Sequence, residues 1–156
     1  MAIRYLGSRM RFESEVRSHL NRKGVPGEAQ EAALERLREL GLLSDRDTCA
    51  AWIRDRMNFS PRGTIHMRRD LLRRGVDRQV VEDALSAELA PGAETDLAVR
   101  VLKGRAKRFV AVSKDVARRR MWSVLAGRGF PPEVVHEAID RFAVDRESPL
   151  ERAGEL

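Results

Sequence analysis

Cysteine and aromatic residues are scarce in this chain of 156 residues, and each shortage excludes a class of structure. Cys49 is the only cysteine, which excludes an intrachain disulfide and a cysteine-rich zinc site. It stands beside Ala50 and Ala51, so we expect a buried thiol rather than a nucleophile. Aromatic residues make up 5% of the chain, and one deep core built from aromatic side chains is therefore excluded.

Long apolar runs are missing as well. No stretch approaches the about 18 consecutive apolar residues that a membrane-spanning helix needs. Residues 1–10 contain Arg4 and Arg9 and lack the apolar run of a signal peptide. The sequence therefore predicts a cytoplasmic protein that does not interact with a membrane.

Motifs of catalysis and cofactor binding are also missing. The chain contains no Walker loop, no G-x-G-x-x-G and no G-x-S-x-G. His19, His66 and His136 lie far apart, and none has the i, i+4 partner that a metal site on a helix requires. Asp45 and Asp47 are expected to cap a helix rather than to form an acid–base pair. We therefore predict no catalytic residues, no metal, no cofactor and no enzymatic activity.

Charged residues, in contrast, make up 35% of the chain and alternate with apolar ones, which is typical of amphipathic helices. The 30 Lys and Arg outnumber the 24 Asp and Glu, giving a formal net charge of +6. Such a surplus favours acidic partners, of which nucleic acid is the commonest. A basic protein whose charge serves only solubility is the alternative.

A repeat becomes visible when three glycines, Gly24, Gly75 and Gly129, are aligned. They lie 51 and 54 residues apart, and each follows a leucine by four residues and precedes an alanine by nine. A basic residue stands before each glycine and an apolar residue after it. A cation followed by glycine is typical of a helix C-terminus, because the cation faces the negative end of the dipole and glycine adopts positive φ at low cost. Each repeat therefore contains a helix that ends at a glycine turn, followed by another helix.

The predicted fold class is all-α, with three tandem three-helix repeats in an elongated array that can curve. The repeats are expected at residues 1–43, 44–90 and 91–143, followed by a flexible tail at 144–156. The expected helices span about 2–10, 13–23, 28–41, 45–58, 61–74, 77–89, 93–109, 113–127 and 132–143.

The last helix of each repeat carries apolar residues at helical spacing, which predicts its buried face. In the first repeat this face is expected to hold Ala29, Ala33, Leu37 and Leu40. The corresponding faces in the other two repeats are Val80, Val81, Ala84 and Leu85, and Val134, Val135, Ala138, Ile139 and Phe142.

The cations are unevenly distributed. Residues 100–128 hold ten Lys or Arg and one acid, and residues 54–78 hold eight Arg and three Asp. Helical spacing predicts two basic stripes, one of Arg62, His66, Arg69 and Arg73 and one of Arg100, Lys103 and Lys107. Like charges on one helix face repel each other, and a phosphate backbone or an acidic groove would relieve that repulsion. The alternative is a solvated face without a partner.

The candidate binding residues, for a filament or for DNA, are the cations of these stripes and of the basic region that follows. They are Arg62, Arg69, Arg73, Arg100, Lys103, Lys107, Arg108, Lys114 and Arg119.

The order of six segments resembles the RecX family, the regulators of the RecA recombinase. The resemblance covers about residues 2–143, and each segment alone is a weak signal. The segments are Ala2–Leu6 (AIRYL), Glu15–Leu20 (EVRSHL), Leu37–Asp45 (LRELGLLSD), Trp52–Arg56 (WIRDR), Leu71–Val76 (LLRRGV) and Leu125–Phe130 (LAGRGF).

This resemblance implies a negative regulator that binds in the groove of the RecA–single-stranded DNA filament and inhibits ATPase, strand exchange and SOS induction. It also implies a protein of recombination and DNA repair without catalytic residues. We expect a monomer whose partner is the RecA nucleoprotein filament, with non-specific contact to single- or double-stranded DNA. A helical DNA-binding transcriptional regulator and a helical scaffold that binds only protein are the two alternatives.

Overall fold

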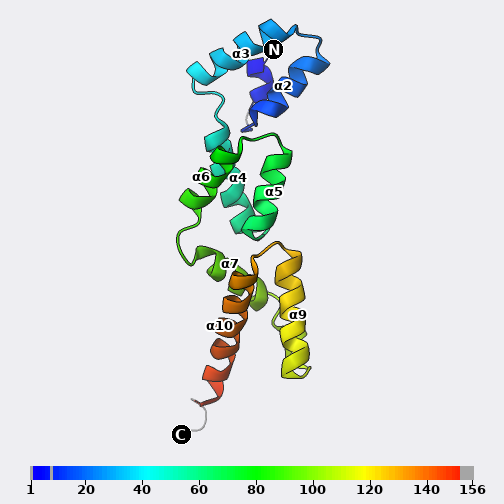
Figure 1. Cartoon of the computed structure of the whole chain (residues 1–156), viewed down its shortest axis with the longest axis vertical. Helices are drawn as coiled ribbons and strands as arrows, with labels where there is room; N and C mark the ends of the chain where they lie inside the picture. The colour runs from blue at the N-terminus through cyan, green and yellow to red at the C-terminus, as the bar shows by residue number, and fades with distance from the viewer. Residues whose placement is uncertain (1, 8, 152–156) are drawn as a thin grey trace. The chain divides into compact units, whose positions relative to one another are not determined.

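The structure is a computed structural model that describes residues 2–7 and 9–151, with side chains up to Asp145. The described residues contain helices and no strand, so the predicted all-α class is confirmed (Figure 1). The helices are α1 (Ala2–Leu6), α2 (Glu13–Arg22), α3 (Gly27–Glu39), α4 (Asp45–Phe59), α5 (Thr64–Arg73), α6 (Arg78–Glu88), α7 (Ala93–Lys103), α8 (Lys107–Val110), α9 (Lys114–Gly127) and α10 (Pro132–Glu151).

Four predicted helices differ from the observed ones by three residues or more, and one of them, expected at 61–74, begins only at Thr64. The first ends at Leu6 instead of residue 10, because Gly7 has a φ of 44°, outside the helical region. The helix expected at 93–109 is divided into α7 and α8. The last helix continues to Glu151 instead of ending at 143, so part of the predicted tail is helical, and residues 152–156 lie outside the described residues.

The chain forms two compact units. Unit 1 contains residues Met1–Arg54 and Arg68–Glu88, and unit 2 contains residues Asp55–Met67 and Leu89–Leu156. The boundaries fall within α4 and within α5, so the units do not coincide with the three predicted repeats. The division into repeats at 1–43, 44–90 and 91–143 stays a prediction.

The three aligned glycines do end helices in the same way. Gly24, Gly75 and Gly129 have φ angles of 72°, 80° and 83°. In each turn, the residue after the glycine donates its N–H to the carbonyl of the leucine before it: Val25 to Leu20 at 3.1 Å, Val76 to Leu71 at 3.4 Å, and Phe130 to Leu125 at 3.2 Å. This is the Schellman pattern, which satisfies helix C-terminal carbonyls within the chain segment itself.

The core of unit 1 includes a cluster of buried aliphatic side chains from α1, α2, α3 and the residues after them. Its members are Ala2, Leu6, Val16, Leu20, Leu34, Leu37 and Leu43. The predicted face of α3 was partly wrong, because Ala29 and Leu40 are exposed and Gln30 and Leu34 are buried instead. Gln30 is tolerated there because its Nε2 donates to Asn21 Oδ1 at 2.6 Å and to the Val25 carbonyl at 2.7 Å.

Cys49 lies in α4 and is 0% exposed, as its apolar neighbours predicted. Burial raises the pKa of its thiol to about 11, and the Asp45 carboxylate contributes to the same direction. Because the thiolate is the reactive species, we expect the native protein to react with a thiol reagent at pH 8 far more slowly than the denatured protein. Stopped-flow absorbance with a disulfide reagent measures both rates, and equal rates would contradict the burial.

Glu13 joins α2 to α3 through an ion pair in unit 1. Its carboxylate accepts hydrogen bonds from Arg38 at 2.5 and 3.1 Å and from Arg17 at 3.2 Å. The hydrogen bond from Arg38 is the main cause that lowers the pKa of Glu13, and burial opposes it. A carboxyl with a lowered pKa stabilises the fold above its unfolded pKa, and this contribution is lost as the pH falls through the folded pKa.

We therefore expect Glu13→Gln to lower the free energy of unfolding by about 1 kcal/mol at pH 7, a modest value because both arginines are well exposed to solvent. The difference between variant and wild type should shrink as the pH falls below the ordinary glutamate pKa of 4.5. Urea denaturation at a series of pH values measures it. A difference that stays constant with pH would show that the charge of Glu13 is not its cause.

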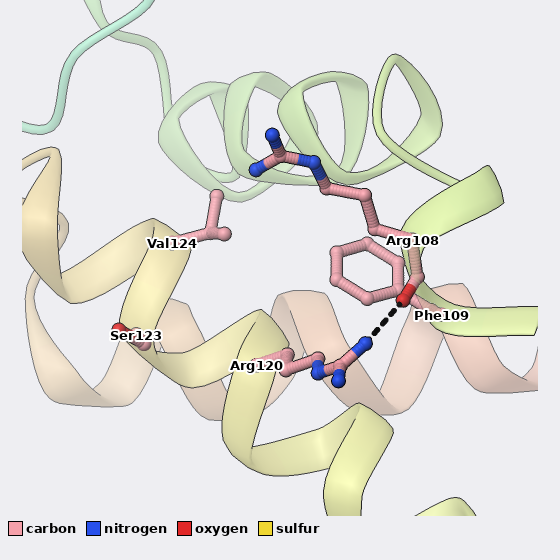
Figure 2. Close-up of a pocket in the computed structure, with 5 residues that line it drawn as sticks. All are labelled: Arg108, Phe109, Arg120, Ser123 and Val124. Atoms are coloured by element: carbon pink, nitrogen blue, oxygen red, sulfur yellow. Dashed lines mark hydrogen bonds between the residues drawn. The ribbon is translucent and has the colours of Figure 1, made fainter. Parts of the chain in front are cut away.

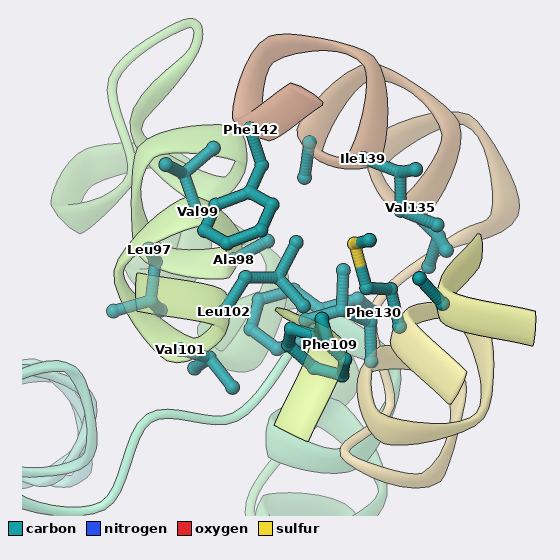
Figure 3. Close-up of a cluster of buried hydrophobic side chains, with 14 residues drawn as sticks. Leu97, Ala98, Val99, Val101, Leu102, Phe109, Phe130, Val135, Ile139 and Phe142 are labelled. Atoms are coloured by element: carbon teal, nitrogen blue, oxygen red, sulfur yellow. The ribbon is translucent and has the colours of Figure 1, made fainter. Parts of the chain in front are cut away.

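The core of unit 2 brings together α7, α8, α9 and α10 (Figure 3). Leu102 and Leu125 are 0% exposed, and Phe109 packs edge-on against Phe142 with ring centroids 6.1 Å apart. The predicted face of the last helix is correct at Val135, Ala138, Ile139 and Phe142, which are all buried. This core holds α8 and α9, which together carry six Lys or Arg residues.

Candidate functional site

In unit 2, the loop before α5 is bound to the turn between α9 and α10 by main-chain hydrogen bonds. The Gly63 N–H donates to the Arg128 carbonyl at 3.0 Å, and the Ile65 N–H donates to the Gly129 carbonyl at 3.1 Å. A Cβ atom on Gly63 would lie 2.2 Å from the Gly129 carbonyl oxygen, so only glycine permits this approach. These contacts of Gly63 and Ile65 with Arg128 and Gly129, which we call the joint, hold the loop against a turn that is far away in the chain.

Arg128 is bonded to the chain at this joint, and two further arginines, Arg62 and Arg105, lie near it. Its Nη1 donates to the Pro61 carbonyl at 2.8 Å. Burial lowers the pKa of Arg128, and the positive charges of Arg105 and Arg62 lower it further. Among the described residues, no carboxylate contributes to this shift. Three guanidinium groups from three separate segments are therefore near enough for their charges to interact, and the Glu94 carboxylate accepts from the Thr64 N–H at 2.7 Å beside the same loop.

The basic neighbourhood continues along the short helix α8. Lys107 and Arg108 are exposed there, and with Arg105 and Lys103 they line a hollow at the turn between α7 and α8. A second hollow is lined by Arg108, Phe109, Arg120, Ser123 and Val124 (Figure 2).

Figure 2 also shows Arg120 donating to the main-chain carbonyl of Arg108, at 3.2 Å. This contact connects the cations of α8 to those of α9. We call the resulting group the basic cluster, and it consists of Arg62, Arg105, Lys107, Arg108, Arg120 and Arg128.

The first predicted stripe does not exist as one face of a helix. Arg62 precedes α5, which begins at Thr64, and the ring of His66 lies against Gly129. Arg69 is paired with Asp70 at 3.5 Å, and Arg73 is exposed in the last turn of α5. The stripe failed because the Gly63 contact with the α9–α10 turn delays the start of the helix.

The second predicted stripe is divided by the end of α7 at Lys103. Arg100 donates to the Met57 carbonyl, and Lys103 pairs with Asp145 at 3.4 Å, so both contact the protein itself. Lys107 lies on α8 instead. Consecutive N–H donors at Arg105 and Ala106 bond to carbonyls three residues before them, which tightens the chain and ends the α-helical register.

Of the remaining candidates, Arg108 belongs to the basic cluster, and Lys114 and Arg119 are exposed on α9. Sequence reasoning left three cluster members, Arg105, Arg120 and Arg128, out of the candidate set. In the sequence, Arg128 is recognisable only as the cation before Gly129 at the end of a helix, and its partner Pro61 lies 67 residues away. No local signal in the sequence reports such a contact.

Among the described residues, no group of three or more His, Cys, Asp or Glu side chains is placed to hold a metal ion. In the same part of the chain, no helix combines the length and the hydrophobicity that crossing a bilayer requires.

Comparison with known proteins identifies two domains. Residues 1–37 match the family model for the first three-helix domain of RecX, and residues 44–85 match that for its second three-helix domain. The regulatory protein RecX of Prosthecochloris aestuarii is 32% identical over 141 residues, covering 89% of each chain. That of Mycolicibacterium smegmatis is 30% identical, covering 89% of this chain and 76% of its own.

The fold is also similar to a solved structure. The crystal structure of RecX from Lactobacillus salivarius superposes with a TM-score of 0.85 over 92% of both chains. At 22% sequence identity, this likeness concerns the fold alone. The sequence relatives and the matched domains carry the assignment of the family.

Proposed function

Because this chain belongs to the RecX family of regulatory proteins, we propose that it is a negative regulator of the RecA recombinase. It binds in the groove of the RecA–single-stranded DNA filament and inhibits ATPase and strand exchange. SOS induction, which depends on the filament, is damped as a consequence. The chain acts without a cofactor or catalytic residues, as a cytoplasmic monomer in recombination and DNA repair.

The observation that carries this proposal on the chain itself is the basic cluster. Beside the larger effect of burial, the positive charges of Arg105 and Arg62 lower the pKa of Arg128, so these like charges lie near enough to repel one another. An anionic partner removes that repulsion, and DNA phosphates and acidic protein surface both supply the charge. A filament offers both along one groove.

Inhibition then follows from differential binding. A ligand changes the populations of two filament states only by as much as its affinities for them differ. This protein is expected to bind more tightly to the filament state that does not hydrolyse ATP. Added protein then shifts the filament toward that state. Hydrolysis and strand exchange both fall, with no chemical step performed by the regulator.

The deciding experiment is a titration of this protein into RecA on single-stranded DNA with ATP hydrolysis measured. Inhibition that saturates with concentration is the expected result. An unchanged hydrolysis rate at saturating protein would reject the proposal. Charge reversal at Arg69 and Arg73 in the same assay tests whether α5 is part of the contact, since unchanged inhibition would exclude these two side chains.

A further inference from the structure

Phe59 is exposed where every other phenylalanine is buried. The chain has five phenylalanines, and Phe12, Phe109, Phe130 and Phe142 are only 2–3% exposed. Phe59 is 82% exposed, more than any other large hydrophobic residue in the described chain. Phenylalanine is among the residues that proteins most often bury, so its exposure sets Phe59 apart from the other four.

The position of Phe59 is fixed by contacts on both sides. It is the last residue of α4, and two residues before it the Met57 carbonyl accepts a hydrogen bond from Arg100. Two residues after it, the Pro61 carbonyl accepts a hydrogen bond from Arg128 at 2.8 Å. Consecutive residues span at most about 3.6 Å each, so the Cα of Phe59 lies within about 7 Å of that of Pro61.

Phe59 therefore stands at the edge of the basic cluster. Arg62 follows it by three residues, Arg128 is bonded to the Pro61 carbonyl between them, and Arg105 is near enough to Arg128 for its charge to lower the pKa of Arg128. The result is one exposed aromatic ring close in the chain to Arg62 and to the carbonyl that binds Arg128, within unit 2.

Single-stranded nucleic acid is the polymer that uses both features. Its phosphates bind to cations, and its unpaired bases stack on aromatic side chains, whereas a duplex keeps its bases stacked inside. The carboxylates of an acidic protein surface satisfy the cations but do not stack on the exposed ring. We propose that Phe59 is a stacking platform for a base of single-stranded nucleic acid, whose phosphates are bound by Arg62, Arg105 and Arg128.

This contact is made by the chain alone, so it is tested without RecA and does not depend on the proposed function. The full-length protein is titrated into three dye-labelled probes, and fluorescence anisotropy is measured. The probes are an oligothymidylate, an abasic oligonucleotide of equal length, and a duplex. The abasic strand keeps the phosphates and removes the bases, so it separates stacking from charge.

Phe59→Ala should weaken binding to oligothymidylate by about 5- to 100-fold, which corresponds to the loss of one base stack. Its binding to the abasic strand and to the duplex should equal that of the wild type. Phe59→Tyr, which keeps the ring, should restore binding to oligothymidylate. The matched control is Val144→Ala, which shortens another exposed apolar side chain of unit 2, and it should leave all three affinities unchanged.

Three results would overturn the inference. Phe59→Ala could bind oligothymidylate as the wild type does, or it could lose affinity equally for all three probes. It could also bind all probes normally and lose only its inhibition of RecA, which would place Phe59 against protein. A chain that shows the expected pattern but does not inhibit RecA supports the stacking site and rejects the proposed function alone.

Discussion

Replacing Gly129 by alanine is expected to lower the free energy of unfolding by about 2 to 5 kcal/mol. The φ of Gly129 is 83°, a conformation that costs an alanine about 1–2 kcal/mol. In addition, the new Cβ would lie 2.3 Å from Cγ of His66, an overlap that the neighbouring main chain must relieve at about 1–3 kcal/mol. Both costs fall on the joint that holds Arg128 in the basic cluster.

Gly24→Ala provides a matched control for this change. Gly24 has a similar φ of 72° in the same kind of turn, and a Cβ there would meet nothing within 4 Å. It should therefore lose only the conformational part, about 1–2 kcal/mol. Urea denaturation followed by circular dichroism and tryptophan fluorescence measures both variants. Equal losses would show that the contact between Gly129 and His66 does not contribute.

Removing three charges of the basic cluster is expected to have the largest effect on function. The triple variant Arg105→Gln, Lys107→Gln and Arg108→Gln removes three cluster cations, each of which we expect to contact one phosphate. For single-stranded DNA, the slope of the logarithm of the association constant against the logarithm of the salt concentration changes by about 0.7 per phosphate contact. The magnitude of this slope should therefore fall by about 2 in the variant. Inhibition of ATP hydrolysis by RecA should require a correspondingly higher concentration of the variant than of the wild type.

The control carries the same change in net charge on the other unit. Arg22, Lys23 and Arg46 are exposed cations of unit 1, and all three are replaced by glutamine. This variant should keep the wild-type slope and the wild-type inhibition. If the two triple variants behave alike, net charge alone determines binding, and the cluster has no special role.

The turns were predictable from the sequence because they are local. In a Schellman turn, the residue after the glycine bonds to a carbonyl five residues earlier, as Val25 does to Leu20. The residue types that favour such a turn therefore stand together in the chain. For this reason, the positive φ of the three aligned glycines could be predicted from the sequence. The same holds for the buried face of α10, since helical periodicity is a property of neighbouring residues.

The buried face of α3 marks the limit of this reasoning. Periodicity alone favoured Ala29 and Leu40, which are exposed. The structure buries Gln30 instead, because Asn21 and the Val25 carbonyl accept its two N–H groups. A polar residue becomes a core residue only when partners from another segment are placed to satisfy it.

The candidate site, too, was predictable from the sequence only where it depends on local features. The sequence by itself located the excess of cations in residues 100–128 and identified Lys107 and Arg108 within it. It placed Arg62 on a helix face with Arg69, although Arg62 precedes the helix. That error arose because the start of α5 is determined by the contact of Gly63 with the turn after α9.

The amino-acid sequence alone thus determined most of the helices, the three aligned glycine turns and the sign of the charge, because each depends on residues within a few positions of one another. Only the tertiary structure decided which cations share a neighbourhood. Arg128 meets Pro61 across 67 residues, and this approach requires a glycine on each side of the joint. Charges act through space rather than along the chain, so their grouping follows from packing and not from their order.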